Sequence, residues 1–293
     1  MSQLIDYDLP LFRPPSEAQS LILQVTLGCS HNRCTFCSMY RQKRFRPRSL
    51  EEVLADIERA RNLLGPDLPR VFLADGDALC LSSRRLLDVL RPLGEAFPRL
   101  QRVAIYANAR DILSKTDEEL ALLRRHKLKL VYVGLESGDE QTLARVDKGA
   151  TVEEIVRAVR RAAAAGMTTS VMILVGLAGR ERRLEHARAS AEAVTRMAPT
   201  YTALLTYIPT PGSPLFEEVQ AGRHALPDPL ESLEEIREVV RHVGCETYFT
   251  CNHASNYLPL RGRLPSARSR LLALLDGALR GELPIKPELL RGL

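Results

Sequence analysis

Long apolar runs are absent from this sequence, since no stretch reaches 18 consecutive apolar residues. A helix that crosses a bilayer needs about 20 such residues, so neither a membrane span nor a membrane partner is expected. The first residues, MSQLIDYDLPLFRPP, also lack the basic and then apolar order of a secretory signal. We therefore expect a globular protein of the cytoplasm.

Charge and cysteine content narrow the function classes further. The net charge of +5 and the pI near 9.0 favour an anionic substrate, a nucleic acid or an acidic protein partner. Three of the six cysteines fall within nine residues, whereas the others are scattered: Cys29, Cys34 and Cys37 against Cys80, Cys245 and Cys251. In a reducing compartment, such a tight group predicts a metal before it predicts disulfides.

Short apolar runs recur from residue 21 onward and predict six strands. They are LILQVTL (21–27), RVFLA (70–74), RVAIYA (102–107), KLVYVGL (129–135), TSVMILVGL (169–177) and YTALLTYI (201–208). None of them alternates strictly between apolar and polar residues. This pattern is typical of parallel strands that are covered on both faces.

Helical spacing fills the intervals between these runs. We expect helices at 50–64, 81–95, 116–126, 139–165 with a break at Gly149, 182–196 and 229–243. Ser49, Thr116 and Thr151 stand at helix starts, where hydroxyl side chains cap well. Alternating strands and helices predict an α/β fold with a parallel sheet. Six repeats fall short of eight, so we expect an open, partial (βα)6 barrel of the TIM type.

The predicted domain organisation has three parts. Residues 1–20 contain three prolines and little periodicity, which indicates an extended N-terminal arm. The barrel core is expected at 21–215. Residues 216–293 form a C-terminal extension that we expect to cap the barrel, and its last part, 260–293, has seven Lys or Arg against three Asp or Glu.

The loop GCSHNRCTFC begins where the first predicted strand ends, and it carries the chemistry. Three thiolates can ligate three irons of a [4Fe–4S] cubane and leave the fourth iron open to a substrate. A structural zinc with His31 as the fourth ligand is the alternative, because short Cys and His loops often bind zinc. The remaining cysteines and histidines show no paired spacing of the kind that zinc sites use. Spacing alone leaves both readings open.

The loop followed by six strand–helix repeats resembles the radical S-adenosylmethionine (radical SAM) superfamily over about residues 20–215. Several turns look like those of relatives of the elongator catalytic subunit and of oxygen-independent coproporphyrinogen oxidase. The spacing here is C-x4-C-x2-C, one residue longer in the first gap than the family's usual C-x3-C-x2-C. The longer gap changes the length of the loop between the first two cysteines and leaves all three cysteines in place as ligands that the resemblance implies.

The resemblance implies a [4Fe–4S] cluster on Cys29, Cys34 and Cys37, with S-adenosylmethionine as cosubstrate. Such an enzyme takes an electron from a donor such as flavodoxin or ferredoxin and cleaves S-adenosylmethionine reductively. The 5′-deoxyadenosyl radical that results abstracts hydrogen from a substrate, which the sequence does not identify. The alternative function is a zinc-containing nucleic-acid-binding protein without catalysis.

The same resemblance implies nine positions that contact the cosubstrate. They are Phe36 before the third cysteine, Gly76 and Asp77 in the turn after the second strand, Asn108 after the third, Glu136 and Ser137 in the turn GLESG, Lys148, Gly176 in the turn GLAG, and Ile208 after the sixth strand. Each of these segments follows a predicted strand, and the active sites of parallel barrels gather at the carboxyl ends of the strands.

Several of these residues also have ordinary structural readings. Asp77 suits a helix N-cap, and Asn108 suits a turn. Phe36 could be a plain loop aromatic. Lys148 could be an exposed lysine near the C-terminus of a helix.

Two further features fall outside the resemblance. The basic run from Arg41 to Arg48 contains no acid and is typical of a solvated loop, although it could guide an anionic substrate or an acidic electron donor. Cys245 and Cys251 could belong to a substrate site together with His253, or they could be buried structural cysteines.

Overall fold

The computed structural model describes residues 5–292, which fold as two compact units. The described strands form an open eight-stranded sheet in the order β1-β4-β5-β6-β7-β8-β9-β10 and a separate two-stranded ribbon of β2 and β3. Strand order follows chain order throughout the large sheet. The expected α/β fold, a partial barrel with a C-terminal extension, is confirmed.

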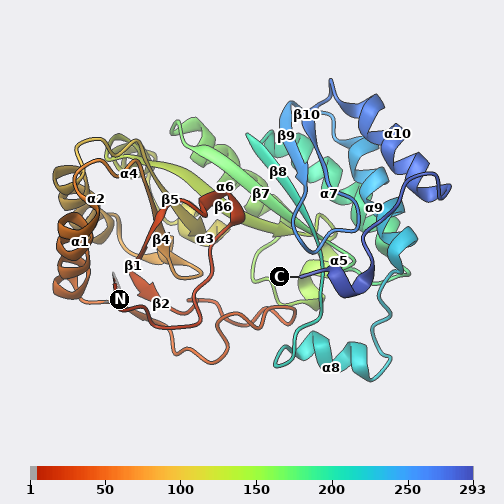
Figure 1. Cartoon of the computed structure of the whole chain (residues 1–293), viewed down its shortest axis with the longest axis horizontal. Coiled ribbons are helices and arrows are strands. Elements are labelled where there is room, and N and C mark those ends of the chain that lie inside the picture. The colour runs from red at the N-terminus through yellow and green to blue at the C-terminus, as the bar shows by residue number, and fades with distance from the viewer. Residues whose placement is uncertain (1–4, 293) are drawn as a thin grey trace. The chain divides into compact units, whose positions relative to one another are not determined.

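Unit one comprises residues up to Asn32, 39–133 and 161–169. Its strands are β1 (Leu21–Gln24), β2 (Thr26–Leu27), β3 (Arg46–Pro47), β4 (Arg70–Ala74), β5 (Arg102–Ala107) and most of β6 (Leu128–Glu136). Its helices are α1 (Leu50–Leu64), α2 (Ser83–Ala96), α3 (Ala109–Leu113) and α4 (Asp117–Arg125). Strands β1, β4, β5 and β6 are parallel neighbours, and α1 packs against α2 and β1 (Figure 1).

Unit two comprises residues 33–38, 134–160 and the chain from Ser170 onward. Its strands are β7 (Thr168–Val175), β8 (Tyr201–Thr206), β9 (Thr247–Cys251) and β10 (Leu260–Leu264). Its helices are α5 (Glu140–Arg145), α6 (Val152–Ala164), α7 (Arg183–Met197), α8 (Pro214–Gln220), α9 (Pro229–His242) and α10 (Arg268–Leu279). Strands β7, β8 and β9 are parallel and β10 is antiparallel, while α9 packs between α7 and α10 (Figure 1).

The predicted elements form with few changes. Strands β4 and β5 have the predicted bounds, and the break at Gly149 separates α5 from α6. Ser49 and Thr116 complete capping boxes, and the Thr151 hydroxyl accepts from the Glu154 amide at 3.2 Å. The run 21–27 is not one strand, because Thr26 and Leu27 leave the large sheet to pair with β3.

The region beyond residue 215 adds elements that the sequence did not predict. Strand β9 continues the parallel sheet beside β8, and β10 follows it as an antiparallel edge. The domain boundaries after residues 20 and 215, and the capping role of the extension, stay predictions. Among residues 5–292, no helix is long and apolar enough to cross a membrane.

Candidate functional site

The two ends of the cysteine loop, which lie in unit one, are both tied to a buried carboxylate. Asp75, directly after β4, is fully buried, and its Oδ2 accepts from the Gly28 amide at 2.9 Å. Lys43, from the other end of the loop, donates to the same oxygen at 3.1 Å. Gln24 donates to the second oxygen, Oδ1, at 3.0 Å. Residues 28 and 43 are therefore tied to one acid, which fixes the base of the loop.

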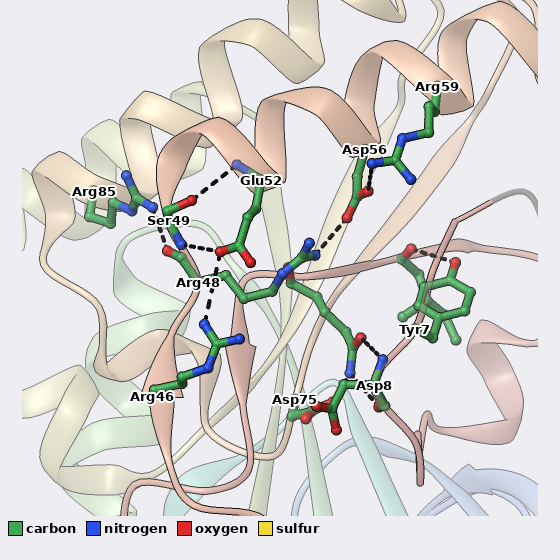
Figure 2. A network of polar contacts seen from close by, with 12 residues as sticks. Tyr7, Asp8, Arg46, Arg48, Ser49, Glu52, Asp56, Arg59, Asp75 and Arg85 are labelled. Carbon is green, nitrogen blue, oxygen red and sulfur yellow. Dashed lines mark hydrogen bonds and ion pairs between the residues drawn. The ribbon is translucent and has the colours of Figure 1, made fainter.

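The basic run is only partly the solvated loop that the sequence predicts. The Lys43 side chain is 6% exposed and pairs with Asp75 and Asp8. The Arg48 side chain is 11% exposed and reaches Asp56 on α1 at 2.6 Å (Figure 2). The acids that neutralise these two cations, Asp8, Asp56 and Asp75, all lie outside the run, so inspection of the run alone could not reveal them.

The three loop cysteines are half-buried, and none is in a disulfide. Cys34 and Cys37 are linked through a backbone turn, in which the Cys37 amide donates to the Cys34 carbonyl at 3.2 Å. Within residues 5–292, no group of three or more His, Cys, Asp or Glu side chains is already assembled as a metal site. Three cysteine thiols outside any disulfide, on one anchored loop, are the donor set that an iron–sulfur cluster requires, so the residues present fit the group.

The middle of the loop, residues 33–38, belongs to unit two. The Thr35 amide donates to the Val146 carbonyl at 2.9 Å, and the Leu215 amide donates to the Thr35 carbonyl at 2.9 Å. Phe36 packs against an apolar cluster formed by Val146, Leu177, Tyr207 and Leu215. The ring is therefore part of a packed site at the ends of β7 and β8 rather than a free loop aromatic.

Asp77 is fully buried in unit one and accepts from several donors. Its Oδ1 accepts from the Asn108 amide at 3.3 Å, while Oδ2 contacts the Ser30 hydroxyl and the Arg110 guanidinium. The carboxylate thus joins the residue after Cys29 to the end of β5. Asp77 stands at the N-cap position of a short 3₁₀ helix, but its side chain does not cap that helix.

Sequence reasoning missed a second acid beside Asp77. Burial and then the Asp77 charge raise the pKa of Asp111 to about 7. Burial also lowers the pKa of Lys115 and raises the pKa of Cys80 to about 12. Asp111 lies three residues after Asn108 in the segment YANARD, so its position at a strand end was the available signal.

Gly76 and Asn108 have identifiable local surroundings. A Cβ at Gly76 would approach the Tyr40 ring, with Cδ2 at 2.8 Å and Cζ at 3.2 Å, so this position excludes any side chain. Asn108 precedes α3 without a side-chain cap bond. Contacts of either residue with the cosubstrate stay predictions.

Glu136 and Lys148 form an ion pair in unit two. The Lys148 Nζ lies 3.0 Å from Glu136 Oε1, and the two side chains are 9% and 13% exposed. Lys148 is therefore not the exposed lysine that the structural reading requires. Glu136 has a φ of +61°, a conformation that non-glycine residues rarely adopt. A Cβ at Gly134 would meet both charged groups, which explains the glycine.

Ser137, next to this pair, is fully buried and engaged within the protein. Its hydroxyl lies 2.8 Å from His186 Nδ1 and accepts from the Asp139 amide at 2.9 Å. The predicted grip on ribose hydroxyls stays a prediction. In the structure the Ser137 hydroxyl therefore binds other residues of unit two and stabilises the turn.

The turn at Gly176 borders a cavity of about 250 Å³ in unit two. Gly176 has a φ of +85°, and its amide donates to Glu235 Oε1 at 2.9 Å. The cavity wall includes Gly176, Thr206, Tyr207, Pro209, Tyr257 and Arg291. Ile208 is half-buried between two of these wall residues.

Residues from the C-terminal region hold this strand end in place. Asn256 is buried, and its Oδ1 accepts from both the amide and the hydroxyl of Thr206 at 2.9 Å. Cys251 is fully buried, and burial raises its pKa to about 12. His253 Nδ1 lies 2.8 Å from the Ser255 hydroxyl. Cys251 is therefore a buried cysteine of β9, in line with the structural reading.

Comparison with known proteins decides the family. The profile of the Radical SAM superfamily matches residues 23–189, more than half of the chain. The chain belongs to the radical SAM superfamily. It is an enzyme of the radical SAM class, and the cofactors of that class are S-adenosylmethionine and a [4Fe–4S] cluster. These comparisons lend no support to a zinc-containing nucleic-acid-binding protein.

Solved structures show the same fold. Coproporphyrinogen III oxidase (HemN) from Escherichia coli aligns with a TM-score of 0.59 at 17% identity, covering 76% of this radical SAM chain and 51% of that chain. The radical S-adenosylmethionine methyltransferase TsrM from Kitasatospora setae aligns with a TM-score of 0.57 at 20% identity, covering 98% of this chain and 60% of that one. Identities this low establish the fold alone.

Curated relatives share about half of this radical SAM chain. The 4′-phospho-dehydrooxetanocin synthase of Priestia megaterium is 26% identical over 172 residues, which are 52% of this chain and 23% of that protein. An uncharacterised protein of Methanopyrus kandleri is 30% identical over 178 residues, covering 56% and 32% of the two chains. The match thus spans less than half of the length of either relative.

Proposed function

We propose that this protein cleaves S-adenosylmethionine reductively at a [4Fe–4S] cluster held by Cys29, Cys34 and Cys37, and then removes hydrogen from a substrate. When bound, the cluster and its cosubstrate supply an electron and a 5′-deoxyadenosyl radical, chemistry that no side chain provides. The observation that carries the proposal is the anchored loop with three cysteines, none of them in a disulfide.

The loop base has a defined task in this function. A cluster ligand must be held in position before the metal arrives, because ordering a loop upon binding costs conformational entropy. Asp75 reduces that cost by holding Gly28, next to Cys29, and Lys43, six residues after Cys37. We assign Asp75 and Lys43 as positioning residues for the ligand loop.

Asp77 is proposed to receive the ammonium group of the methionyl part. Its carboxylate is buried and lies beside a second acid, Asp111, whose pKa is raised to about 7 by burial and then by Asp77. Two neighbouring carboxyl groups repel each other when both are ionised. A bound ammonium would relieve that repulsion and form charge-assisted hydrogen bonds.

Lys148 and Glu136 are proposed to bind the carboxylate and the ribose hydroxyls respectively. Each now neutralises the other across 3.0 Å, so the pair is held ready without an unpaired buried charge. A cosubstrate carboxylate would share Lys148 with Glu136. The positive φ of Glu136 directs this side chain against Gly134 and Lys148.

The apolar side of the cosubstrate is proposed to lie against Phe36, Gly176 and Ile208, with Asn108 providing a polar contact. Phe36 is already packed on Tyr207 and Leu177, residues adjacent to Ile208 and Gly176 in the chain. An aromatic ring next to a glycine turn gives a flat surface that a nucleobase can cover.

The reducing partner is proposed to be a small acidic electron carrier such as flavodoxin or ferredoxin. The net charge of +5 favours association with an acidic protein, and the same charge favours an anionic substrate. Arg44 and Arg46, both exposed on the loop that follows the cysteines, are proposed to contribute to this charge.

Metal analysis tests the ligand assignment. Anaerobically reconstituted protein is expected to contain about four irons and four sulfides per chain. Alanine at Cys29, Cys34 or Cys37 should abolish cluster loading, whereas the matched variant Cys245→Ala, a half-buried cysteine outside the loop, should load fully. Full loading of all three loop variants would sink the proposal, as would stoichiometric zinc in colourless protein.

A further inference from the structure

Beyond the residues assigned above, we infer that His186 and Glu235 are positioning residues that bridge the turn after β6 to the turn after β7 and hold both in the shape that binds S-adenosylmethionine. The inference rests on the proposed function, because both turns are proposed cosubstrate contacts. The bridge draws one member from α7 and one from α9, and α9 lies beyond the residues that match the superfamily profile.

The bridge is a continuous chain of polar atoms inside unit two. Ser137 Oγ lies 2.8 Å from His186 Nδ1, and His186 Nε2 lies 3.3 Å from Glu235 Oε1. The Gly176 amide donates to the same glutamate oxygen at 2.9 Å. The Ser137, His186 and Glu235 side chains are fully buried. The chain therefore begins at the end of β6 and finishes at the end of β7.

At its first member the bridge is tied to the backbone of the turn after β6. The Ser137 oxygen accepts from the Asp139 amide at 2.9 Å and lies 2.8 Å from His186 Nδ1. The tautomer of His186 decides which of these two side chains donates to the other.

Two atoms of the bridge are buried without full hydrogen bonds. His186 Nε2 lacks the alignment of a hydrogen bond to Glu235 at 3.3 Å, and Glu235 Oε2 has no partner. Buried polar atoms in this condition destabilise a fold, whereas apolar side chains of similar size would not. His186 and Glu235 lower the stability of the fold in this way and yet contact the two turns that are proposed to bind S-adenosylmethionine. This combination indicates that the two residues serve the function of those turns.

The two titratable members of the bridge, His186 and Glu235, are mainly neutral near pH 7. Burial raises the pKa of Glu235 to about 8 and lowers the pKa of His186 to about 4. The charged groups that face them are Arg183, which partly counteracts the glutamate shift, and Asp139, which partly counteracts the histidine shift. His224 faces the Gly176 turn from the segment before α9, and burial lowers its pKa as well.

Replacing Glu235 by glutamine, an amide of the same shape, distinguishes a role in positioning the turns from a role in folding alone. Glu235→Gln keeps the acceptor for Gly176 and cannot ionise, whereas Glu235→Ala removes the bridge. Glu238→Gln is the matched control on the same helix, because Glu238 binds Arg188 and Arg241 instead of a strand-end turn. The dissociation constant of S-adenosylmethionine is measured by equilibrium dialysis on cluster-loaded, unreduced protein at pH 7 and pH 9.

At pH 7 we expect Glu235→Ala to bind S-adenosylmethionine about tenfold more weakly than wild type, as removal of a supporting ligand shell does elsewhere. Glu235→Gln and Glu238→Gln should match wild type. At pH 9 wild type and Glu238→Gln should weaken by about tenfold, because only about a tenth of Glu235 keeps its proton one unit above its pKa. Glu235→Gln should lose clearly less affinity than wild type over this interval, since only the titration of groups other than Glu235, such as Asp111, remains.

A second measurement needs no cluster. Hydrogen exchange of the amides at 134–138 and 176–179 is followed in unloaded protein at pH 7. Glu235→Ala and His186→Leu should raise exchange in both turns, while Glu235→Gln should not. If Glu235→Ala does not fold, the pH comparison between wild type and Glu235→Gln decides.

The inference is overturned if Glu235→Gln retains the wild-type loss of affinity at pH 9, or if Glu235→Ala binds and exchanges like wild type. Failure of the proposed function would look different. Wild type would then bind no S-adenosylmethionine at all, and the exchange measurement would still report on the bridge.

Discussion

Two buried carboxylates perform the same backbone task in the two units, with opposite electrostatics. Asp75 accepts the Gly28 amide in unit one, and Glu235 accepts the Gly176 amide in unit two, each at 2.9 Å. Both side chains are fully inaccessible to solvent. Asp75 has the Lys43 ammonium at 3.1 Å, whereas Glu235 faces a neutral histidine.

The comparison shows that the amide of a glycine after a strand can donate to a carboxylate that has a cation beside it, or to a carboxyl group that has none. A carboxylate with a buried cation keeps its charge compensated, and loss of one partner leaves the other unpaired. A carboxylate without such a cation resists ionisation, and an amide can replace it. The two acids should therefore respond in opposite ways to the same change from acid to amide.

The largest effect is expected for Asp75→Asn. The change leaves Lys43 buried with only Asp8 as an acidic partner, and breaking a buried pair costs about 3 kcal/mol or more in the free energy of unfolding. Iron loading should fall with it, because Gly28 and Lys43 lose their common anchor. Urea unfolding and iron analysis measure the two outcomes.

The double variant Lys43→Met with Asp75→Asn is the control for that experiment. Because it removes both charges, it should recover much of the lost stability. Equal stability of wild type and the single variant Asp75→Asn would contradict the comparison.

A smaller effect, with a distinctive pH dependence, is expected for Glu235→Gln. In wild type, a raised glutamate pKa stabilises the fold most below its ordinary value of 4.5, and this contribution is lost as the pH rises towards about 8. The lowered pKa of His186 works in the opposite direction between about 4 and 6.5. The two contributions offset each other at low pH, and above pH 6.5 His186 no longer offsets the glutamate effect. Asp111, whose pKa is about 7, titrates alike in wild type and in Glu235→Gln and so cancels from their difference.

Over that interval the free energy of unfolding of wild type should fall by about 2 kcal/mol relative to Glu235→Gln, since each pH unit corresponds to about 1.4 kcal/mol. Urea titrations at pH 6.5 and pH 8 measure this difference. Parallel pH profiles for the two proteins would show that Glu235 is already ionised at pH 6.5.

Lys148→Met tests the paired charges of unit two. The change leaves Glu136 without its cation in a site where both side chains are at most 13% exposed, and stability should fall by about 1–2 kcal/mol. Affinity for S-adenosylmethionine should fall by about tenfold, which corresponds to about 1.4 kcal/mol. The double variant Lys148→Met with Glu136→Gln should regain stability but not affinity for S-adenosylmethionine. If it regained both, Lys148 would not be a residue that binds the cosubstrate.

The smallest effect is expected for Arg145→Ala. Arg145 pairs with Glu218 at 2.9 Å, but the two side chains are 43% and 37% exposed. Exposed pairs contribute about 0–1 kcal/mol. The midpoint temperature of thermal unfolding should hardly change. A loss of stability as large as that of Lys148→Met would mean that the burial of an ion pair does not determine its contribution to stability.

The barrel could be predicted because its strands are continuous apolar runs with clear ends. Strand β4 follows Pro69, and four of its five residues are fully buried. Strand β10 escaped prediction because only the two leucines at the ends of LRGRL are buried. Its place at the edge of the sheet, beside β9, makes this basic segment a strand.

Site residues could be predicted where a short sequence motif contains them. They could not be predicted where their role depends on which side chains are buried in the folded chain. The cysteine loop, Asp77, Glu136 and Lys148 stand in recognisable turns after strands. Glu235 is one of several glutamates in α9, and the sequence of this helix does not show which glutamate is fully buried. A weak signal existed, because Glu235 lies four residues before the buried Val239 and so shares its face of the helix.

The central claim is that this chain cleaves S-adenosylmethionine reductively at a cluster held by Cys29, Cys34 and Cys37. The most direct test is to reduce the loaded protein with dithionite in the presence of S-adenosylmethionine, under anaerobic conditions, and to quantify 5′-deoxyadenosine by chromatography. The account predicts 5′-deoxyadenosine from wild type and none from the three cysteine variants. Well-loaded, reduced wild type that yields no 5′-deoxyadenosine would contradict it.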